Sequence, residues 1–385
     1  MSAVSHSRYL IIGAGSMGLS AAHYLAQQTT ETIQVLDAYS PPHDQGAHHG
    51  ETRLIRLAYG EGAAYVPLAK QAWALWQAMA QEAGQALLMP VGVVNCGPSD
   101  DPFVVQVQES ADQYQLALET LSGDELNARY AGWQLPAEMT GCVESQAGVL
   151  RIDRIMRWLR QRVSAQAQIQ LSTGAGVVRL EALDSGGVLA HCADGRQFSG
   201  DRVLLSSGQS LQPLMASVGI ELPLTRVRKT FAWFECDERY TPDQFPGFSI
   251  NDASGIYYGF PNIEGAGFKI GRHDGGQPLP PGEPLRAFGE LEEDLAELQP
   301  VLDRYFPGVG ALRHGAVCQY IRTPDEHFLI DECLPGVLVA GGFSGHGYKF
   351  ASVLGHLFAH WLFDGEKSPL LAPFSAQRFS SPGFE

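Results

Sequence analysis

Three glycines near the N-terminus have the spacing that a phosphate-binding turn requires. Gly13, Gly15 and Gly18 form the pattern G-x-G-x-x-G. Such glycines let the backbone turn tightly and approach a pyrophosphate, whose charge then faces the N-terminus of a helix. Asp37 follows the last glycine by about 20 residues, where these motifs place a carboxylate that binds a ribose. The residues predict dinucleotide binding and leave NAD and FAD open.

Two arginines and a group of histidines follow this region. Arg53 and Arg56 lie three residues apart, so they share one face if the segment is helical. Arginine can bind a carboxylate through two parallel hydrogen bonds, although most arginines are solvated surface groups. His43, His48 and His49 have no cysteine or carboxylate nearby at a recognisable ligand spacing, so we predict no metal site.

The cysteines taken alone suggest no catalytic role. Cys318 is one of six scattered cysteines, none of them in a C-x-x-C pair, and a lone cysteine is usually a small buried apolar residue. In a chain without a signal-peptide pattern, this number of cysteines implies no disulfide framework. Lys269 lies in an alternating segment, where a lysine is ordinarily exposed. Chemistry at either position needs further support.

The elements around the glycines support the dinucleotide prediction. Tyr9–Ile12 is an apolar run typical of a buried strand, and Met17, Ala21, Tyr24 and Leu25 then recur at helical spacing. A second apolar run over 33–36 ends at Asp37. Strand, turn, helix, strand and acid therefore occur in the order that a nucleotide-binding unit requires.

Later segments suggest that this unit is discontinuous. Residues 201–208 form an apolar strand that ends in small residues, and residues 337–340 form another strand before a glycine-rich turn and a helix over 352–362. Helices are also predicted from Pro67 to Gly84 and over 153–163. Antiparallel strands over 227–234, 256–260 and 267–271, followed by an acidic helix through Leu291, Leu295 and Leu298, form a second domain.

Length and composition limit the class of protein. The 385 residues suggest about two domains. The net charge of −16 argues against nucleic acid and anionic membranes as partners. The N-terminus lacks a signal-peptide pattern, and no stretch is apolar for the roughly 20 residues that cross a bilayer. We expect a reduced, cytoplasmic, enzyme-sized protein.

Six motifs resemble one known family. GAGSMG, HHGETRLIR, YYGFP, GAVC, DEHFLID and GFSGHGYKF occur in the order found in the monomeric sarcosine oxidase and N-methyl-L-tryptophan oxidase family. The resemblance covers about residues 8–378. It implies an α/β fold like that of D-amino-acid oxidases, with a Rossmann-like FAD-binding domain (1–85, 150–215 and 318–385). A second α+β substrate domain with an antiparallel sheet would comprise 86–149 and 216–317.

The resemblance also implies a flavin site. The first motif, with Gly13, Ser16, Met17 and its other glycines, and Asp37 would bind the ADP part of FAD. Cys318 matches the cysteine that joins the flavin 8α-methyl carbon in a covalent thioether. The segments that would contact the flavin hold the following residues: His48, His49, Arg53, Ser207, Gly208, Gly345, Gly347 and Lys349.

A substrate site follows from the same resemblance. Arg56 and Lys349 match the pair that holds the substrate carboxylate, and Tyr258 and His273 match residues near the substrate amine. Lys269 matches a lysine that activates O2, because a fixed ammonium stabilises the negative charge that O2 gains. The implied enzyme is a monomer. It oxidises an N-methyl amino acid with O2 and water, which yields the primary amino acid, formaldehyde and hydrogen peroxide.

The substrate within the family is less sharply indicated. VRKTFAWFECDERY, KIGRHDGGQ and KFASVLG look most like N-methyl-L-tryptophan oxidases, and we favour that substrate. Phe343 and GIYYGFP look more like sarcosine oxidases. Leu57 departs from a histidine that is common in both groups, which puts the pocket beside Arg56 in question.

Two other readings compete with an oxidase. One is a dehydrogenase that passes electrons to a protein or quinone, against which Lys269 argues. The other is a non-catalytic flavin-binding protein, against which Arg56, Lys269, Cys318 and Lys349 argue together.

Overall fold

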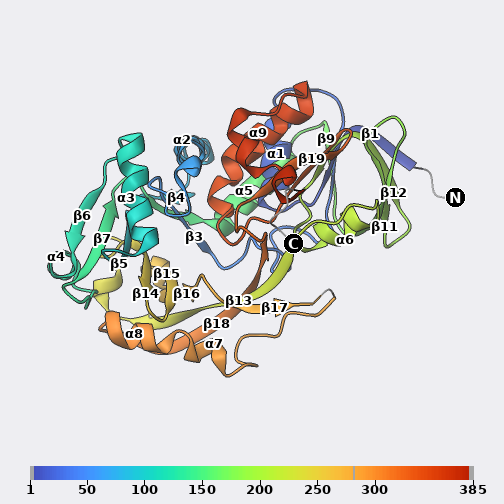
Figure 1. The fold of residues 1–385 in the computed structure, drawn as a ribbon. Coiled ribbons are helices and arrows are strands. Elements are labelled where there is room, and N and C mark those ends of the chain that lie inside the picture. Colours follow the sequence, from blue (N-terminus) through green and yellow to red (C-terminus); the bar gives the residue numbers. More distant parts are fainter. Residues whose placement is uncertain (1–3, 281, 381–385) are drawn as a thin grey trace. The chain divides into compact units, whose positions relative to one another are not determined.

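The computed structural model describes residues 4–280 and 282–380, and the chain divides into two compact units (Figure 1). Within the described residues, the first unit comprises 4–49, 152–227 and 320–380. The second comprises Gly50–Arg151 and Arg228–Gln319. The sequence-based boundaries instead assign 50–85 to the first domain and 216–227 to the second. The roles of the units as FAD-binding and substrate domains remain a proposal.

The first unit is built on an eight-stranded sheet. Its strands are β1 (Val4–Ile12), β2 (Ile33–Leu36), β9 (Ile169–Ser172), β10 (Val177–Ala182), β11 (Val188–Cys192), β12 (Gln197–Leu205), β19 (Leu329–Leu334) and β20 (Val337–Gly341). β1 pairs in parallel with β12 and β2, β9 continues the sheet from β2, and β20 continues it from β12. β10, β11 and β19 are antiparallel to their neighbours. The carboxyl ends of β1, β2, β12 and β20 therefore point to one edge, where ligands bind in such sheets.

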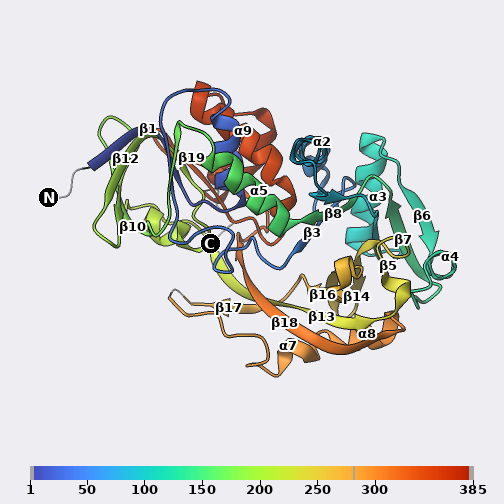
Figure 2. The ribbon, with the colours of Figure 1, turned by 180° about the vertical axis from the view of Figure 1, so that it is seen from behind.

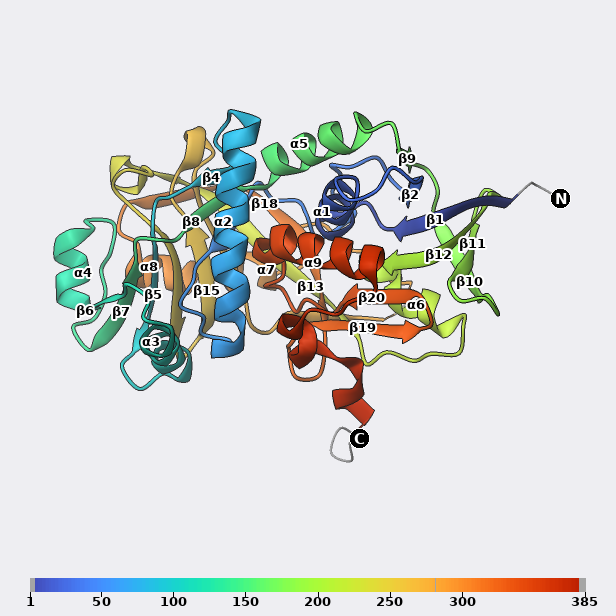
Figure 3. The same cartoon turned by 90° about the horizontal axis from the view of Figure 1, so that it is seen from above.

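Helices cover both faces of this sheet. α1 (Ser16–Leu25) packs against α9 (Ala351–Asp364) and α5 (Ile152–Ser164), and Figure 3 shows the three helices together. α6 (Leu211–Ala216) shares a core cluster with Leu10 and Ile12 of β1 and with β10 and β11. Tyr9 and Ile11 alternate with Leu10 and Ile12 and are also completely buried, as a strand covered on both faces requires. The predicted Rossmann-like arrangement is confirmed.

The second unit contains a nine-stranded, mostly antiparallel sheet (Figures 1 and 2). Its strands are β5 (Val93–Pro98), β6 (Glu119–Ser122), β7 (Met139–Glu144), β13 (Thr225–Cys236), β14 (Gly247–Asp252), β15 (Gly255–Phe260), β16 (Phe268–Arg272), β17 (Gln277–Leu279) and β18 (Val309–Arg322). The order is β17-β13-β16-β15-β14-β5-β7-β6, with β18 also on β13. The predicted strands at 227–234, 256–260 and 267–271 are β13, β15 and β16.

The second unit also contains a three-stranded sheet and five α-helices among its described residues. They are β3 (Thr52–Ile55), β4 (Leu88–Met89), β8 (Gly148–Arg151), α2 (Val66–Ala83), α3 (Pro102–Tyr114), α4 (Gly123–Arg129), α7 (Glu293–Ala296) and α8 (Gln299–Tyr305). α2 begins next to Pro67 and ends at Gly84, whose φ of 61° forms the left-handed cap, as predicted. The single acidic helix predicted through Leu291, Leu295 and Leu298 is wrong in extent. Only α7 lies within the predicted range, and α8 begins after Leu298 with Pro300 in its first turn, where a missing N–H is tolerated.

An aromatic core lies on one face of the large sheet. Phe248 and Phe268 stack with ring centroids 5.6 Å apart, and Trp133, Phe245 and Phe306 pack around them. Side chains alternate along β16, so residue 269 points to the face opposite Phe268. The core thus fixes the strand that carries one of the predicted catalytic residues.

The crossing of α1 and α9 gives a stability prediction. A Cβ on Gly355 would lie 2.3 Å from Ser20 Cβ and 2.7 Å from the Ser20 carbonyl carbon. Gly355→Ala must therefore push the helices apart, and we expect about 1–3 kcal/mol of destabilisation. Urea unfolding measures this cost. Phe363→Ala on the exposed part of α9 is the control, and equal stability of Gly355→Ala and wild type would contradict the crossing.

Candidate functional site

The first glycine turn has the close backbone contacts that its sequence predicts. Gly13 has φ of +106°, and a Cβ there would lie 2.5 Å from the Ser206 carbonyl oxygen. A Cβ on Gly18 would lie 1.8 Å from the Gly13 carbonyl oxygen. Gly15 is the N-terminal cap of α1. The turn thus brings the N-terminus of α1, which begins with Ser16 and Met17, to the carboxyl end of β1.

Asp37 lies at the end of β2 and holds this turn. Its Oδ2 accepts a hydrogen bond of 2.7 Å from Ala14 N, and its Oδ1 accepts one of 2.8 Å from Tyr39 N. His43 Nε2 lies 3.6 Å from Oδ1. Burial opposes ionisation of Asp37, but the nearby His43 ring and the hydrogen bonds from Tyr39 and Ala14 hold its pKa below the usual value. The carboxylate is charged at neutral pH and can accept further hydrogen bonds from a ribose.

His43 lies near Asp37, which the sequence did not predict. Its ring packs against His48 at 4.6 Å between centroids and against Tyr39 at 5.1 Å. A Cβ on Gly15 would lie 3.6 Å from His48 Nδ1, so His48 approaches the turn, as expected for a cofactor-contacting residue. The available sequence signal was a histidine six positions after the acid that ends β2. Among the residues that the structure describes, no group of three metal-ligating side chains forms a metal site.

The end of β12 contributes to the same edge of the sheet. Ser206 N donates to Ile12 O over 2.9 Å, and Ser206 Oγ donates to Gly13 O over 3.3 Å. Ser207 Oγ is buried and has no hydrogen-bond partner in the part of the chain that the structure describes, and Gly208 has φ of +57°. An unpartnered buried hydroxyl beside a glycine turn fits a site for a polar ligand. The residues of this edge fit the predicted dinucleotide.

A second turn follows β20. Ser344 and Gly345 have φ of +47° and +84°, and a Cβ on Gly345 would lie 2.2 Å from the Tyr320 ring. Ser344 Oγ accepts from Thr323 N, and Ser344 N donates to Ile321 O. Gly347 leads into a short 3₁₀ turn (Tyr348–Phe350) and then α9. The predicted glycine-rich turn between strand and helix is confirmed.

Lys349 is buried within this second turn. Only 6% of the residue is exposed, and Nζ donates to the His346 carbonyl oxygen over 3.2 Å. His346 Nε2 lies 3.1 Å from the Glu326 carbonyl oxygen. A buried ammonium held by a backbone carbonyl can bind an additional anion, because the carbonyl does not cancel its charge.

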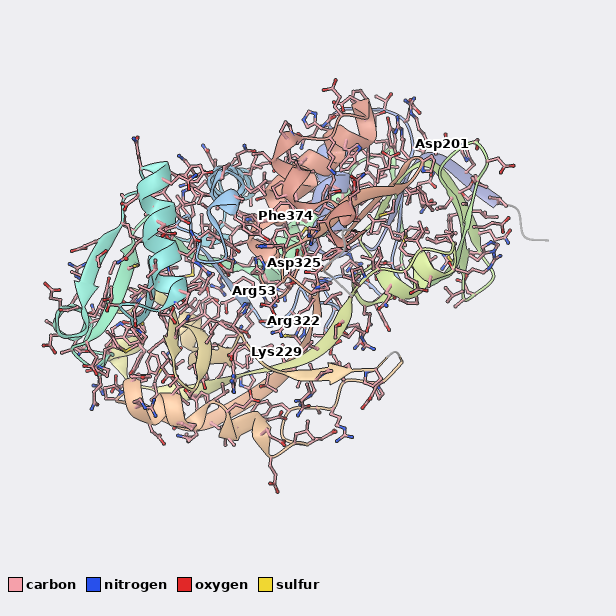
Figure 4. The ribbon with its side chains drawn as sticks, viewed as in Figure 1. Arg53, Asp201, Lys229, Arg322, Asp325 and Phe374 are labelled. Atoms are coloured by element: carbon pink, nitrogen blue, oxygen red, sulfur yellow. The ribbon has the colours of Figure 1, made fainter. Side chains whose placement is uncertain are left out.

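The DEHFLID segment supports the turn from behind. Asp325 pairs with Arg378 through an Nε–Oδ2 contact of 2.7 Å, and the Phe328 ring packs against Phe374 at 5.1 Å and His346 at 4.7 Å. Figure 4 labels Asp325 and Phe374, which come from the last part of the chain. This segment therefore packs the turn and its lysine into the first unit.

In the second unit, Arg56 lies just after β3 in a mostly buried position. It is 6% exposed, and its Nη2 donates to both carboxylate oxygens of Glu61 over 2.8 Å. Its guanidinium also lies 5.1 Å from the Tyr59 ring and 5.3 Å from the Phe103 ring. Burial lowers the pKa of Arg56, but Glu61 and Tyr59 outweigh this effect and raise it, so the cation persists. Arg56 is therefore a built charged site, not a solvated surface arginine.

Lys269 is also buried and lies among neutral groups. It is 2% exposed, and Nζ donates to Gly50 O and, over 3.1 Å, to Thr52 Oγ1. Nζ lies 4.6–4.9 Å from the ring centroids of the following aromatic residues: Phe231, Trp233 and Phe260. Aromatic faces and these oxygens stabilise an ammonium without subtracting from its charge. The surface-lysine alternative is excluded by this burial.

Tyr258 and His273, the two residues expected near the substrate amine, lie close to each other. Their rings are 6.5 Å apart and nearly perpendicular, and His273 N donates to Ile256 O over 2.7 Å. Tyr258 also packs 6.0 Å from Phe260, which borders Lys269. The two predicted pocket residues and Lys269 are thus connected through adjacent strands β15 and β16.

Cys318 on β18 is buried in a positive environment. Burial raises the pKa of its thiol, while Arg53, Lys229 and Lys269, in that order, act to lower it. Figure 4 labels Arg53 from β3 and Lys229 from β13. Arg53 Nη1 donates to Thr52 O over 2.8 Å, and Lys229 Nζ donates to Asp274 O. The thiol, Arg53 and Lys269 therefore belong to one electrostatic environment, to which Lys229 adds a cation that the sequence did not single out.

Arg56 lies in the second unit, and Lys349 and His49 lie in the first. Their joint action at one substrate or flavin remains a proposal. Glu61 and Glu144 are acids near Arg56 that the sequence did not single out, and only Glu61, five residues after Arg56, was close enough in sequence to suggest a pairing. The helices described are each too short or too polar to cross a membrane.

Curated relatives match nearly the whole chain. A monomeric sarcosine oxidase from Bacillus sp. (strain B-0618) is 37% identical over 382 residues, which cover 97% of this chain and 96% of that protein. An N-methyl-L-tryptophan oxidase from Salmonella arizonae is 40% identical over 377 residues, which cover 96% and 98% of the two chains. Both names thus occur at similar identity.

Solved structures show the same fold at lower identity. NikD, described as an unusual amino acid oxidase essential for nikkomycin biosynthesis, superposes with a TM-score of 0.85 at 18% identity over 97% of this chain and 98% of NikD. Glycine oxidase from Geobacillus kaustophilus gives a TM-score of 0.78 at 18% identity over 97% of this chain and 99% of that chain.

The family with the description "FAD dependent oxidoreductase" matches residues 8–361. Together with the two glycine turns and the near full-length relatives, this match shows that the chain belongs to the DAO family of FAD-dependent oxidoreductases.

Proposed function

We propose that the protein oxidises an N-methyl amino acid, with FAD held covalently through a thioether to Cys318 and with O2 as the electron acceptor. The favoured reaction converts N-methyl-L-tryptophan, O2 and water into L-tryptophan, formaldehyde and hydrogen peroxide. The alternative substrate is sarcosine, which would yield glycine. The observation that carries the proposal is the grouping of a buried thiol, Cys318, with the buried cation Lys269 and the partly exposed cation Arg53.

The cofactor would be held at several points of the first unit. Gly13, Gly15, Ser16, Met17 and Gly18 form the turn for the pyrophosphate, and Asp37 would accept hydrogen bonds from the ribose. His48, His49, Ser207, Gly208, Gly345 and Gly347 would contact other parts of FAD. When bound, FAD supplies two-electron oxidation of the substrate carbon–nitrogen bond and passes the electrons to O2.

The substrate would be fixed by its carboxylate. Arg56 offers a planar, charged fork, and Lys349 offers a second cation, so the two would orient the N-methyl group before electrons move. Tyr258 and His273 would line the pocket near the amine. Arg53 and His49 would lie beside the flavin ring, where a cation favours negative charge.

Lys269 would act on O2. Its ammonium is fixed by Gly50 O, Thr52 Oγ1 and three aromatic rings, so it needs no rearrangement to face developing negative charge. This role favours an oxidase over a dehydrogenase that uses a protein or quinone acceptor.

Peroxide release tests the function and the substrate together. The purified protein is supplied with N-methyl-L-tryptophan or sarcosine at equal concentrations, and peroxide and formaldehyde are measured with each. We expect the larger kcat/KM with N-methyl-L-tryptophan. A larger kcat/KM with sarcosine would favour sarcosine oxidase activity, as in the name of the 37% identical relative. Flavin binding without turnover of either compound would favour the non-catalytic reading.

Monomeric state and cytoplasmic location are part of the proposal. The relative named a monomeric sarcosine oxidase supports the first. Sedimentation equilibrium of the holoprotein tests it, and a mass of about one chain, 41.7 kDa, is expected.

The covalent link gives a direct prediction. Acid-precipitated wild type should remain yellow, whereas Cys318→Ser should release its flavin into the supernatant, because a serine hydroxyl is a far poorer nucleophile than a thiolate. Absorbance of the pellet and supernatant gives the measurement. Cys333→Ser is the matched control, since Cys333 is only partly buried and lies outside the positive environment. Loss of flavin from wild type in acid would reject the linkage.

The Arg56–Glu61 pair predicts opposite effects of two variants. Arg56→Ala should raise KM roughly 10- to 100-fold, because a charged hydrogen-bonded pair with the substrate carboxylate is lost. Glu61→Gln should lower KM, since a neutral amide competes less well for the guanidinium. Steady-state kinetics measure both. Arg129→Ala removes an exposed pair with Glu119 in the same unit and should leave KM unchanged. An unchanged KM in Arg56→Ala would remove Arg56 from the clamp.

Lys269→Met should separate the two half-reactions. Anaerobic reduction of the flavin by substrate should stay within about threefold of wild type, while reaction of the reduced enzyme with O2 should slow by at least about 100-fold. Stopped-flow absorbance measures each step. Lys70→Met, at an exposed position of α2, is the control. Equal losses in both steps would refute the role of Lys269 in O2 activation.

A further inference from the structure

Glu144, at the end of β7, is a buried acid that neither the sequence nor the proposed reaction assigns. It is 1% exposed, and its Oε2 accepts hydrogen bonds from Leu57 N over 2.7 Å and from Ala58 N over 2.8 Å. These are the two peptide groups that follow Arg56. A side chain 87 residues away in sequence thus fixes the backbone just after the arginine.

The other oxygen of Glu144 has an unusual environment. Among the described residues, Oε1 is buried without a hydrogen-bond partner, and Arg56 Nε is also buried without one. The two side chains interact electrostatically. One unused acceptor and one unused donor therefore lie in the same buried cluster. A buried polar atom without a hydrogen-bond partner destabilises the folded protein. We therefore expect Glu144 Oε1 and Arg56 Nε to form hydrogen bonds in another state of the protein.

The charged groups around Glu144 are few. Arg56 is the cation that faces it, and Glu61 and Tyr59 act on the same arginine. Cys142 is the titratable neighbour on β7, and the residue opposite Glu144 on β5 is the apolar Val93. Glu61 is thus hydrogen-bonded to the guanidinium, and Glu144 acts on it electrostatically, before any substrate carboxylate arrives.

We propose that Glu144 is a positioning residue for Arg56. It anchors the peptide groups of Leu57 and Ala58, and it adjusts its charge when a carboxylate binds to the guanidinium. The inference rests on the proposed function, because it takes Arg56 as the group that binds the substrate carboxylate.

The adjustment of charge has a definite sign. Burial raises the pKa of Glu144 to about 7, against the opposing effects of the Ala58 and Leu57 amides and of Arg56. A bound carboxylate adds negative charge nearby and favours the protonated form of Glu144 further. Binding and protonation therefore assist each other, so carboxylate affinity is higher below pH 7 and falls as pH rises through that value.

Two variants separate the anchoring role from the charge. Glu144→Gln keeps an acceptor for the two amides and removes the charge, whereas Glu144→Ala removes both. In the FAD-loaded protein, exchange of the Leu57 and Ala58 amides with deuterium should be about tenfold faster in Glu144→Ala and near wild type in Glu144→Gln. KM for the N-methyl amino acid should rise about tenfold in Glu144→Ala, with kcat within about threefold.

Carboxylate binding supplies a readout that is independent of turnover. Indole-3-acetate has no amine, and its binding is followed by the change in flavin absorbance. The wild-type Kd should rise roughly three- to tenfold from about pH 6 to pH 8.5, and the Kd of Glu144→Gln should stay flat. Asp252→Ala is the matched control, because Asp252 is an acid of the same unit whose side chain is 7% exposed and also accepts a hydrogen bond from a backbone N–H, that of Ser254.

The proposal is overturned by three results. The first is amide exchange in Glu144→Ala that is unchanged from wild type. The second is a rise of KM in Asp252→Ala as large as that in Glu144→Ala. The third is a Kd that depends on pH in Glu144→Gln as it does in wild type. If wild type oxidises no N-methyl amino acid, the proposed function fails. The role of Glu144 is then still decided by two measurements, amide exchange and the binding of indole-3-acetate. If Glu144→Ala does not fold, the pH profile of Glu144→Gln decides it.

Discussion

The buried ammonium of Lys269 is the constraint around which the second unit is arranged. Removing an ammonium from water is costly unless other groups replace the lost hydration. Here that replacement comes from Gly50 O, Thr52 Oγ1 and the rings of Phe231, Trp233 and Phe260. These groups come from the chain before β3 and from β3, β13 and β15. The aromatic core on the other face holds β16 and thereby aims Lys269 at them.

The first unit is arranged around a different constraint, because its backbone N–H groups must come close to a ligand. The close approach of Gly18 to Gly13 and of Gly345 to Tyr320 leaves no room for a Cβ. Both turns stand between a parallel strand and a helix, so the positive ends of α1 and of the turn leading to α9 face the same edge of the sheet. Asp37 connects the turn to β2 through Ala14 N.

Local patterns in the sequence predicted much of this arrangement. Strand, glycine turn and helix around Gly13, the second turn around Gly345, and the cap at Gly84 all depend on residues close in sequence. The helix through Leu291, Leu295 and Leu298 was predicted too long, because leucine spacing alone does not show where a helix begins and ends. The roles of Lys269 and Cys318 came from a resemblance to a family, since a lysine on an alternating strand carries no sign of its burial.

Contacts between distant residues explain what the sequence could not reveal. His43 is recognised only because the loop after β2 returns to Asp37. Glu144 is 87 residues from Leu57, and a single acid at the end of a strand gives no indication that it binds two amides there. Lys229 contributes to the field at Cys318 through the folding of β13 against its neighbours.

Two arginine–carboxylate pairs in the second unit, Arg228–Asp294 and Arg56–Glu61, differ in how many of their hydrogen-bonding groups have partners. This difference distinguishes a structural pair from one that can bind a ligand. Arg228 donates to both carboxylate oxygens of Asp294 and to the carbonyl oxygens of Arg286 and Ala287. Asp294 also accepts a hydrogen bond from Gly289 N. Such a closed network stabilises one arrangement and has no capacity for a ligand. Arg56 instead retains an Nε for which the described residues supply no hydrogen-bond partner, and it interacts electrostatically with Glu144, whose Oε1 also has no partner among them. Under the proposed function, this incomplete hydrogen bonding would favour a substrate carboxylate at Arg56, because a new partner for Nε would offset a cost already present in the folded protein.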